Sequence, residues 1–338
     1  MCIFCRTFVA ELATTPIAMS EVNDKTPRQI INHMKRIILF LLLLSAYVLH
    51  VDAAENDSTP GKSDDVEYVV ANANVCPVRE NPSHTAEQAT QLLFGELCEV
   101  VERTPGWMKI RSTVDGQVGW VTSSMLTSIP HNLVASSPDS LIAVVVTPTA
   151  IATPTDGGAP VLLTLGTRLP HYTNGTFSVL GEQYRIDPTS VNNTTQLLNI
   201  GISRDERMDK ICTIAKTLLN TPYLWGGKNM MGIDCSGFTQ VVYAAVGINI
   251  LRNAREQITQ GKAVASLSEA MPGDLAFFGR INPNTNEMRI THVGLLLSPT
   301  EIIHCAGGRV HVDRINAIGI YLPDGTKTHD LVQINRYF

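Results

Sequence analysis

The chain between residues 67 and 128 alternates short apolar-rich runs with turn residues. These runs fall at residues 68–70, 97–101, 108–110 and 118–121. Pro105-Gly106 and Asp115-Gly116 lie between them and supply the turn chemistry that joins antiparallel strands. Strands this short at this spacing predict a small all-β barrel over residues 67–128.

The next stretch, residues 129–200, repeats part of this pattern. Leu163-Thr164-Leu165-Gly166 parallels Leu92-Leu93-Phe94-Gly95 of the first barrel. Prolines at positions 148, 154 and 160 exclude a long helix, because proline removes a backbone donor. We expect a second, divergent barrel of the same kind, with an unrelated β insertion as the alternative.

After residue 200 the apolar spacing changes from that of strands to that of helices. Apolar positions recur every three or four residues over 204–219 and again over 238–245. Cys212 falls on the apolar face of the first helix, so a core position is its simplest role. Apolar runs typical of strands follow at residues 275–278, 292–297 and 301–305. Helices followed by antiparallel strands predict an α+β domain over residues 201–338.

The N-terminal part has the layout of an export signal. Lys35-Arg36 precedes the apolar run 37–44, and small residues lead to Ala53. The run is shorter than the roughly 20 residues that span a bilayer, so we expect cleavage and no stable membrane insertion afterwards. A membrane anchor is the alternative. If the signal is cleaved, the protein is expected in the periplasm or outside the cell.

The segments beside this signal give no information about the fold. Residues 1–33 are interpreted as a doubtful upstream extension, because Met34 is a better start for a signal over residues 34–53. Residues 54–66 are polar, with Pro60-Gly61, and predict a flexible linker.

Composition excludes one class of partner. The 338 residues include 26 Lys and Arg against 31 Asp and Glu, for a net charge of −5. No basic run is present to bind a polyanion, so we expect no nucleic acid partner. We expect a monomer.

The cysteines raise the question of a reactive thiol. Of seven, Cys2 and Cys5 lie in the upstream extension, and five remain at positions 76, 98, 212, 235 and 305. An odd number in an exported protein leaves at least one thiol unpaired. Spacing leaves open whether Cys76 and Cys98 form a disulfide.

Cys235 has the best position for chemistry. It lies in Gly232-Ile233-Asp234-Cys235-Ser236-Gly237, where the second predicted helix begins. The free N–H groups and partial positive charge of a helix N-terminus favour a thiolate, as a nucleophile requires. A buried structural cysteine is the alternative.

Two histidines complete a candidate constellation. His292 and His304 lie on consecutive predicted strands, with the turn at 298–300 centred between them. In an antiparallel pair they would share a face and lie directly opposite, unless a bulge in the turn shifts the register. One imidazole would then accept the thiol proton while the other orients it.

A zinc site is the rival use of Cys235, His292 and His304. No carboxylate lies near either histidine in the sequence to support it or to serve as a further catalytic group. We expect His311 and His329 to be solvated surface residues.

The motifs of this chain resemble those of two known families. Val78-Arg79-Glu80-Asn81-Pro82, Gly106-Trp107 and the segment from Asp115 to Val121 resemble a bacterial SH3-like domain. Six motifs over residues 203–338 look like the series of the NlpC-type cysteine peptidases. In chain order they are Tyr223-Leu224-Trp225-Gly226-Gly227, Asp234-Cys235-Ser236-Gly237-Phe238, Arg252 with Gln257, Pro272-Gly273-Asp274-Leu275-Ala276-Phe277-Phe278, His292-Val293-Gly294 and Ile303-His304.

The resemblance implies a multidomain chain with two SH3-like barrels followed by an α+β, papain-like NlpC catalytic domain. Carried over by position, Cys235 would be the nucleophile, His292 the general base and His304 the orienting third member, with Tyr223 near the oxyanion. The family uses no cofactor and no metal, so none is expected.

The domain order is similar to the subgroup that releases L-Ala-γ-D-Glu from L-Lys or diaminopimelate in cell-wall peptides. There the first barrel closes the cleft, so that only a free N-terminal L-Ala fits. An ammonium in a closed pocket needs anionic partners, for which Asp234 and Glu87 are the candidates. Ser236 would bind a substrate carbonyl or carboxylate. The other candidate substrate contacts are Trp225, Gln117 and Arg252.

Two departures from the subgroup concern specificity. Gln117 stands where a tyrosine often precedes the closing Gly-Trp, and Arg252-Asn253-Ala254 lacks a hydroxyl two residues after the arginine. Two other functions remain open: an endopeptidase acting on polymeric peptidoglycan, or a non-catalytic wall-binding SH3-like protein.

Overall fold

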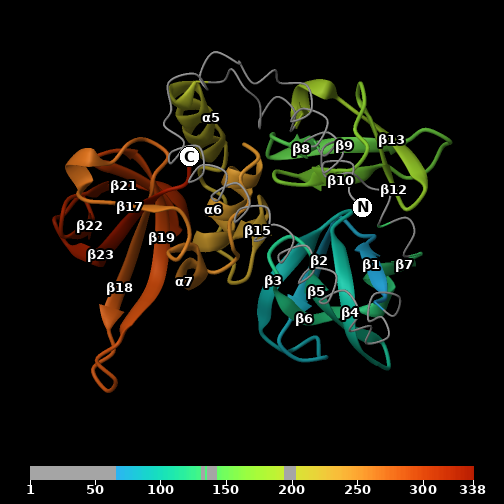
Figure 1. Ribbon diagram of the computed structural model, residues 1–338, viewed down its shortest axis with the longest axis horizontal. Coiled ribbons are helices and arrows are strands. Elements are labelled where there is room, and N and C mark those ends of the chain that lie inside the picture. Colours follow the sequence, from blue (N-terminus) through green and yellow to red (C-terminus); the bar gives the residue numbers. More distant parts are fainter. Residues whose placement is uncertain (1–65, 131–133, 135–142, 194–202) are drawn as a thin grey trace, which may run out of the picture. The chain divides into compact units, whose positions relative to one another are not determined.

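A computed structural model describes residues 66–130, 134, 143–193 and 203–338 (Figure 1). The predicted upstream extension, the signal over residues 34–53 and the linker up to residue 65 lie outside the described residues. No helix within the described ranges is long and apolar enough to cross a membrane.

The first described segment is a sheet of seven short antiparallel strands in the order β3-β2-β6-β5-β4-β1-β7. Buried side chains such as Val69, Val78 and Ile110 fill its core. Cys76 and Cys98 are both buried free thiols, so the disulfide that spacing left open is not formed. The strands are β1 (Tyr68–Ala71), β2 (Val75–Arg79), β3 (Gln88–Leu93), β4 (Leu97–Thr104), β5 (Trp107–Ser112), β6 (Val118–Thr122) and β7 (Leu126–Ile129).

Residues 143–193 form two further small sheets. Their orders are β10-β9-β13-β12 and β11-β8-β14, around a core that includes Leu163, Phe177 and Tyr184. The strands are β8 (Ala143–Val145), β9 (Thr149–Pro154), β10 (Val161–Thr164), β11 (Arg168–Leu169), β12 (Thr176–Val179), β13 (Glu182–Ile186) and β14 (Val191–Asn193).

Helices and strands then follow as the change in apolar spacing predicts. Helix α5 (Arg204–Thr217) begins with a capping box between Ser203 and Glu206, and α6 (Cys235–Ala244) begins at the N-cap Asp234. The third α-helix described is the short α7 (Ala254–Gln257). Single 3-10 turns occur at Ser123–Met125, Pro188–Ser190 and Leu267–Glu269.

The C-terminal strands close into a small barrel. The sheet order is β17-β23-β18-β19-β20-β21-β22, and β22 also pairs with β23, so six strands form a ring with β17 added at its edge. The strands are β17 (Lys262–Val264), β18 (Leu275–Ile281), β19 (Met288–Ser298), β20 (Glu301–Ala306), β21 (Arg309–Ile315), β22 (Gly319–Tyr321) and β23 (Lys327–Arg336), and a separate hairpin joins β15 (Lys228–Asn229) to β16 (Gly232–Ile233).

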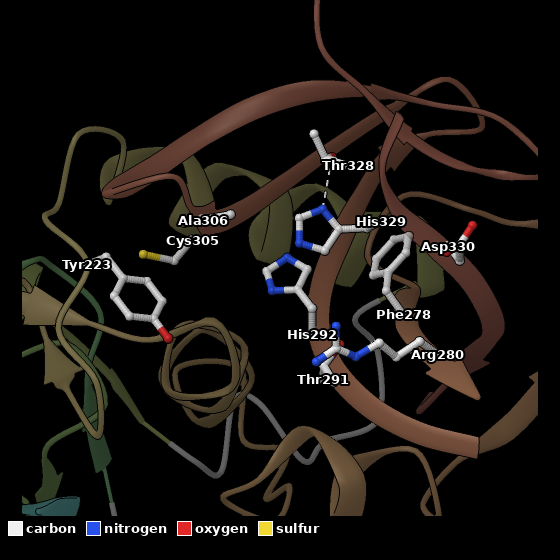
Figure 2. A pocket seen from close by; sticks show the side chains of 11 residues that line it. Tyr223, Phe278, Arg280, Thr291, His292, Cys305, Ala306, Thr328, His329 and Asp330 are labelled. Atoms are coloured by element: carbon white, nitrogen blue, oxygen red, sulfur yellow. Dashed lines mark hydrogen bonds between the residues drawn. The ribbon is translucent and has the colours of Figure 1, made fainter. Parts of the chain in front are cut away.

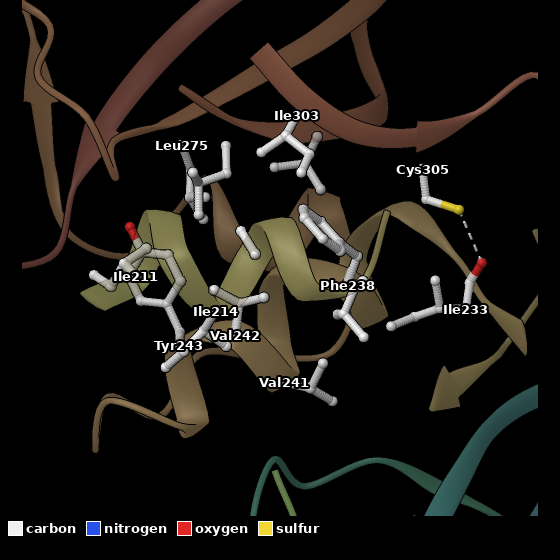
Figure 3. Packing of buried hydrophobic residues seen from close by; sticks show 14 of the residues in the cluster. Ile211, Ile214, Ile233, Phe238, Val241, Val242, Tyr243, Leu275, Ile303 and Cys305 are labelled. Carbon is white, nitrogen blue, oxygen red and sulfur yellow. Dashed lines mark hydrogen bonds between the residues drawn. The ribbon is translucent and has the colours of Figure 1, made fainter. Parts of the chain in front are cut away.

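Strand alternation gives this ring two apolar faces. Leu275, Ile303 and their neighbours pack with Phe238 and Val242 of α6 (Figure 3). Alternate residues, among them Phe278, belong to a second core. The ring therefore holds α6 firmly against β19 and β20, the strands that carry the two predicted histidines.

Candidate active site

Asp234 fixes the start of α6. One oxygen of its carboxylate accepts the Gly237 N–H at 2.6 Å, as an N-cap does, and the other accepts the Gly226 N–H at 2.9 Å. Arg252 donates to both oxygens, at 2.9 and 2.7 Å. A Cβ on Gly237 would lie 2.2 Å from the Gly227 carbonyl oxygen, so only glycine fits there. The segment before the helix is therefore rigid, and Cys235 is its first helical residue.

Cys235 is half-buried, and its surroundings favour the neutral thiol. Burial, together with the negative charge of Asp234, raises its pKa to about 12. Hydrogen bonds from the backbone N–H groups of Val293 and Ser236 act in the opposite direction without reversing the shift. Burial thus opposes the effect expected of the helix N-terminus, which favours the thiolate. The Val293 contact places the sulfur beside β19, one residue after His292.

The two predicted histidines form a buried hydrogen-bonded pair. His292 Nε2 and His304 Nδ1 are 2.7 Å apart, and the residues are 5% and 1% exposed. Burial lowers the pKa of His292 well below its ordinary value of 6.5. Burial also lowers the pKa of His304, against the hydrogen bond to Asp313, which raises it. Both imidazoles are therefore neutral at rest.

The predicted register of this pair is wrong. The turn lies at Pro299-Thr300, with Ser298 opposite Glu301, and a bulge between Leu296 and Ser298 then sets Leu295 opposite Ile303, so His304 lies beside Gly294 and not His292. The two rings meet diagonally on one face. Gly294 makes the room, since a Cβ there would lie 2.8 Å from the Cβ of His304.

A carboxylate that no sequence motif indicates, Asp313, completes the site. Asp313 Oδ2 lies 3.2 Å from His304 Nε2 and 3.1 Å from His311 Nε2. His304 pairs with His311 across β20 and β21, and Asp313 follows two positions later on the same face. The signal was the spacing of His311 and Asp313, which becomes informative only once the pairing of β20 with β21 is known.

His329 also departs from its expected role. Its ring on β23 lies 4.4 Å from that of His292, centroid to centroid, and burial lowers its pKa. His311 is bonded to Asp313 as described above. The expectation that both are solvated surface residues is therefore wrong.

A cavity of about 530 Å³ opens at this end of the ring (Figure 2). Tyr223 lies across it from His292 and His329. Burial, and then the neighbouring Cys235, raise the pKa of the Tyr223 hydroxyl, which stays a donor at neutral pH. The remaining lining residues are Phe278, Gly279, Arg280, Thr291, Cys305, Ala306, Thr328 and Asp330.

Two predicted substrate contacts are internal. Arg252 is 1% exposed, and its guanidinium donates to Asp234, to the Ser236 hydroxyl at 2.9 Å and to Thr90 at 2.8 Å. Its assignment as a substrate-binding residue is therefore wrong, because it has no surface to offer. Ser236 is 6% exposed. Its hydroxyl donates to Asp234 and accepts from Arg252, so it belongs to the same hydrogen-bond network.

The remaining predicted contacts lie in different places. Trp225 is 60% exposed, and its carbonyl accepts the Gln88 side chain at 3.0 Å. Glu87 is exposed, next to Gln88. The Gln117 amide donates to Glu256 of α7 at 3.1 Å, so it joins the first sheet to the catalytic part and does not line the cavity described above.

The chain matches two family models. Residues 220–330 match the NlpC/P60 family, and residues 78–126 match the bacterial dipeptidyl-peptidase Sh3 domain. Both resemblances inferred from the motifs are thus confirmed. A crystal structure of an NlpC/P60 family protein from Bacillus cereus covers 80% of this chain and 99% of its own, with a TM-score of 0.67 at 21% identity.

Curated relatives extend the match. This chain is 28% identical over 231 residues to the gamma-D-glutamyl-L-lysine dipeptidyl-peptidase of Bacillus cereus, and the match covers 64% of this chain and 66% of the relative. The protein of the same name from Bacillus subtilis is 30% identical over 227 residues, covering 64% and 71%. The probable endopeptidase p60 of Listeria grayi is 32% identical over 131 residues, covering 39% and 23%. The chain thus spans about two thirds of the first two relatives. It belongs to the NlpC/P60 family of cysteine peptidases, preceded by an SH3 domain.

Proposed function

We propose that the protein cleaves the bond between γ-D-Glu and a diamino acid, L-Lys or diaminopimelate, in cell-wall peptides that carry a free N-terminal L-Ala. The observation that carries this proposal is the close contact between the SH3 domain and the loop before Cys235. A Cβ on Gly226 would lie 2.5 Å from the Gln88 carbonyl oxygen, so the two backbones touch. A barrel held there would form a wall at the N-terminal side of the substrate.

Buried polar contacts hold this wall in place. Lys228 Nζ lies 2.7 Å from Glu96 Oε1, with side chains 5% and 4% exposed. Gln91 Oε1 accepts from the Lys228 backbone and from the Asn229 amide, each at 2.8 Å. A buried charge pair tolerates little displacement, because separating the partners leaves each charge desolvated.

Recognition of the amine rests on two carboxylates. Glu87 ends the exposed loop of the barrel, one residue before Gln88 contacts Trp225. Asp234 lies beside the nucleophile, but its charge is already compensated by Arg252. We therefore assign the main ionic contact with the substrate ammonium to Glu87 and a hydrogen-bonding role to Asp234. The exposed Trp225 would cover the same end of the substrate.

The catalytic roles follow from the order of hydrogen bonds. An ionised Asp313 can only accept, so His304 Nε2 carries its proton and His304 Nδ1 is left as an acceptor. His292 Nε2 must then donate to that nitrogen. The lone pair of His292 is thereby left on Nδ1, the nitrogen free to take the thiol proton. Asp313 is a positioning residue that sets both tautomers.

The reaction then runs in two steps. The Cys235 thiol gives its proton to His292 as the sulfur attacks the γ-carbonyl carbon, and His292 returns the proton to the departing amine as the thioester forms. Water, deprotonated by His292, cleaves the thioester and restores the thiol. The Tyr223 hydroxyl and the N-terminal N–H groups of α6 would stabilise the oxyanion.

The proposal includes the larger organisation of the protein. Residues 34–53 act as an export signal, which brings the enzyme to the cell envelope. Domain limits at 67–128, 129–200 and 201–338 make residues 129–200 a second, divergent SH3-like barrel, supported by the short strands β8 to β14. The enzyme acts as a monomer.

One alternative has a specific observation in its favour. The relative named a probable endopeptidase p60 matches over 39% of this chain. An endopeptidase on polymeric wall would accept a blocked N-terminus, with the barrels binding the wall.

Mass spectrometry of two peptides separates these functions. The protein is incubated with L-Ala-γ-D-Glu-L-Lys and with its N-acetylated form, beside a Cys235→Ala control. We expect cleavage of the free-amine peptide alone. Cleavage of both would favour the endopeptidase, and cleavage of neither peptide, nor of the diaminopimelate analogue, would contradict the proposed substrate.

A further inference from the structure

Three potential metal ligands lie together on the side of His304 that faces away from His292. His304 Nε2, His311 Nε2 and a carboxylate oxygen of Asp313 all lie within 4.8 Å of one another. The two nitrogens are 3.2 and 3.1 Å from the same oxygen, Oδ2. Tetrahedral zinc with bonds of about 2.0–2.2 Å separates neighbouring ligand atoms by roughly 3.3 Å. The two nitrogen-to-oxygen distances match this spacing, and the two nitrogens, which lie within 4.8 Å of each other, would approach to about the same distance when they share an ion.

The hydrogen bonds of His311 favour a positive charge between its ring and Asp313. Its Nδ1 lies 2.9 Å from the Arg309 carbonyl oxygen, which can only accept, so Nδ1 carries the proton of the neutral ring. The lone pair on Nε2 then points at the Asp313 carboxylate, which is also an acceptor. Two facing acceptors repel unless a second proton or a metal ion lies between them.

We infer that His304, His311 and Asp313 form a binding site for a divalent transition-metal ion such as Zn²⁺, and that the bound ion inhibits the peptidase. Two imidazoles and one carboxylate are a donor set that zinc uses, with water in the fourth position. The His311 side chain is 26% exposed and gives access, whereas His304 and Asp313, at 1% and 9%, are held in place by the fold.

The inhibition rests on the proposed function and follows from the tautomers. A metal on His304 Nε2 needs the lone pair of that nitrogen, so the ring keeps its proton on Nδ1. Nδ1 then donates to His292 Nε2, and His292 must carry its own proton on Nδ1. The nitrogen that should accept the thiol proton is blocked. The ion thus switches off the base without touching Cys235.

Binding can be measured without any peptidase activity. Zn²⁺ is titrated by calorimetry into the full chain carrying Cys235→Ala, so that the nucleophile cannot take the ion. Cys2→Ser and Cys5→Ser remove the N-terminal pair, whose spacing could bind zinc by itself. We expect one equivalent to bind, and an added His311→Asn to weaken binding at least tenfold. His171→Asn, the same change at an exposed histidine of residues 143–193, should have no effect. Absent binding, or equal binding with His311→Asn, would overturn the site.

Two further measurements test the mechanism of inhibition. Co²⁺ added to the chain with Cys235 intact and Cys2 and Cys5 replaced should give an absorption spectrum without a thiolate-to-cobalt charge-transfer band. Zn²⁺ should inhibit cleavage of the free-amine peptide, and a chelator should reverse this. In His311→Asn, inhibition measured relative to the zinc-free activity of the same variant should need at least tenfold more Zn²⁺. A charge-transfer band lost with Cys235→Ala, or inhibition unchanged in His311→Asn, would place the inhibitory ion on the nucleophile and contradict the inference.

Discussion

At the scale of single residues, the chemistry depends on a chain of proton positions that starts at Asp313. Cys235, His292 and His304 can be identified from the sequence, because each lies within a motif of the family. Asp313 has no such motif. Its relation to His304 depends on the pairing of β20 with β21, which sequence spacing alone does not fix.

Removing Asp313 should therefore slow the chemical step. In Asp313→Ala the proton of His304 is free to move to Nδ1, and His292 loses its fixed tautomer. We expect kcat to fall about 100-fold, within the range that a positioned base supplies, with KM changed little. Steady-state kinetics on the free-amine peptide tests this, with Asp324→Ala at an exposed loop as the control. A rise in KM at unchanged kcat would instead assign Asp313 to substrate binding.

A second prediction concerns the pKa of the Cys235 thiol. Because burial raises the pKa of Cys235 to about 12, the thiolate fraction should rise about tenfold per pH unit between pH 7 and pH 10. Iodoacetamide reacts with the thiolate. The alkylation rate of Cys235, followed by peptide mass spectrometry, should rise in the same proportion. A rate that levels off below pH 9 would mean a thiolate–imidazolium pair at rest.

At the level of helices and strands, apolar spacing predicted the type of the longer segments up to residue 305, but neither the later strands nor how the strands register. The helices α5 and α6 and the strands β18 to β20 all occur where periodicity places them. The bulge between Leu296 and Ser298 is invisible in the sequence, because residues 293–297 form a continuous apolar run with no alternation for an extra residue to interrupt.

Gly294 shows the consequence of the shifted register. A Cβ there would lie 2.7 Å from Ile302 Cδ1 and 2.8 Å from His304 Cβ. Gly294→Ala should therefore displace His304, lower stability by about 1–3 kcal/mol and reduce kcat. Urea denaturation and kinetics measure both effects. Gly158→Ala, whose new methyl would lie 3.3 Å from a proline ring, is the control. Unchanged kcat in Gly294→Ala would show that His304 tolerates displacement.

At the scale of the whole molecule, the order of an SH3 domain and a catalytic domain could be predicted from the sequence, because each carries its own motifs. The contacts between the two domains could not be predicted. Lys228 and Glu96 are ordinary charged residues in the sequence, far apart along the chain, and nothing marks them as a buried pair.

Breaking that pair should have two effects. Glu96→Leu leaves the Lys228 ammonium buried without a partner, which should cost about 3–5 kcal/mol. The double variant with Lys228→Met should regain most of this stability in urea denaturation. If the pair holds the wall, Glu96→Leu should also begin to cleave the N-acetylated peptide. Retained selectivity would mean that the other contacts suffice to hold the barrel.

If Cys235 attacks the γ-D-glutamyl carbonyl, the reaction passes through an acyl-enzyme that can be trapped. The protein is mixed with L-Ala-γ-D-Glu-L-Lys, quenched in acid within its first turnovers and digested for mass spectrometry. We expect the peptide containing Cys235 to gain the mass of L-Ala-γ-D-Glu less one water. Turnover that persists in Cys235→Ala, or an adduct on another residue, would contradict it.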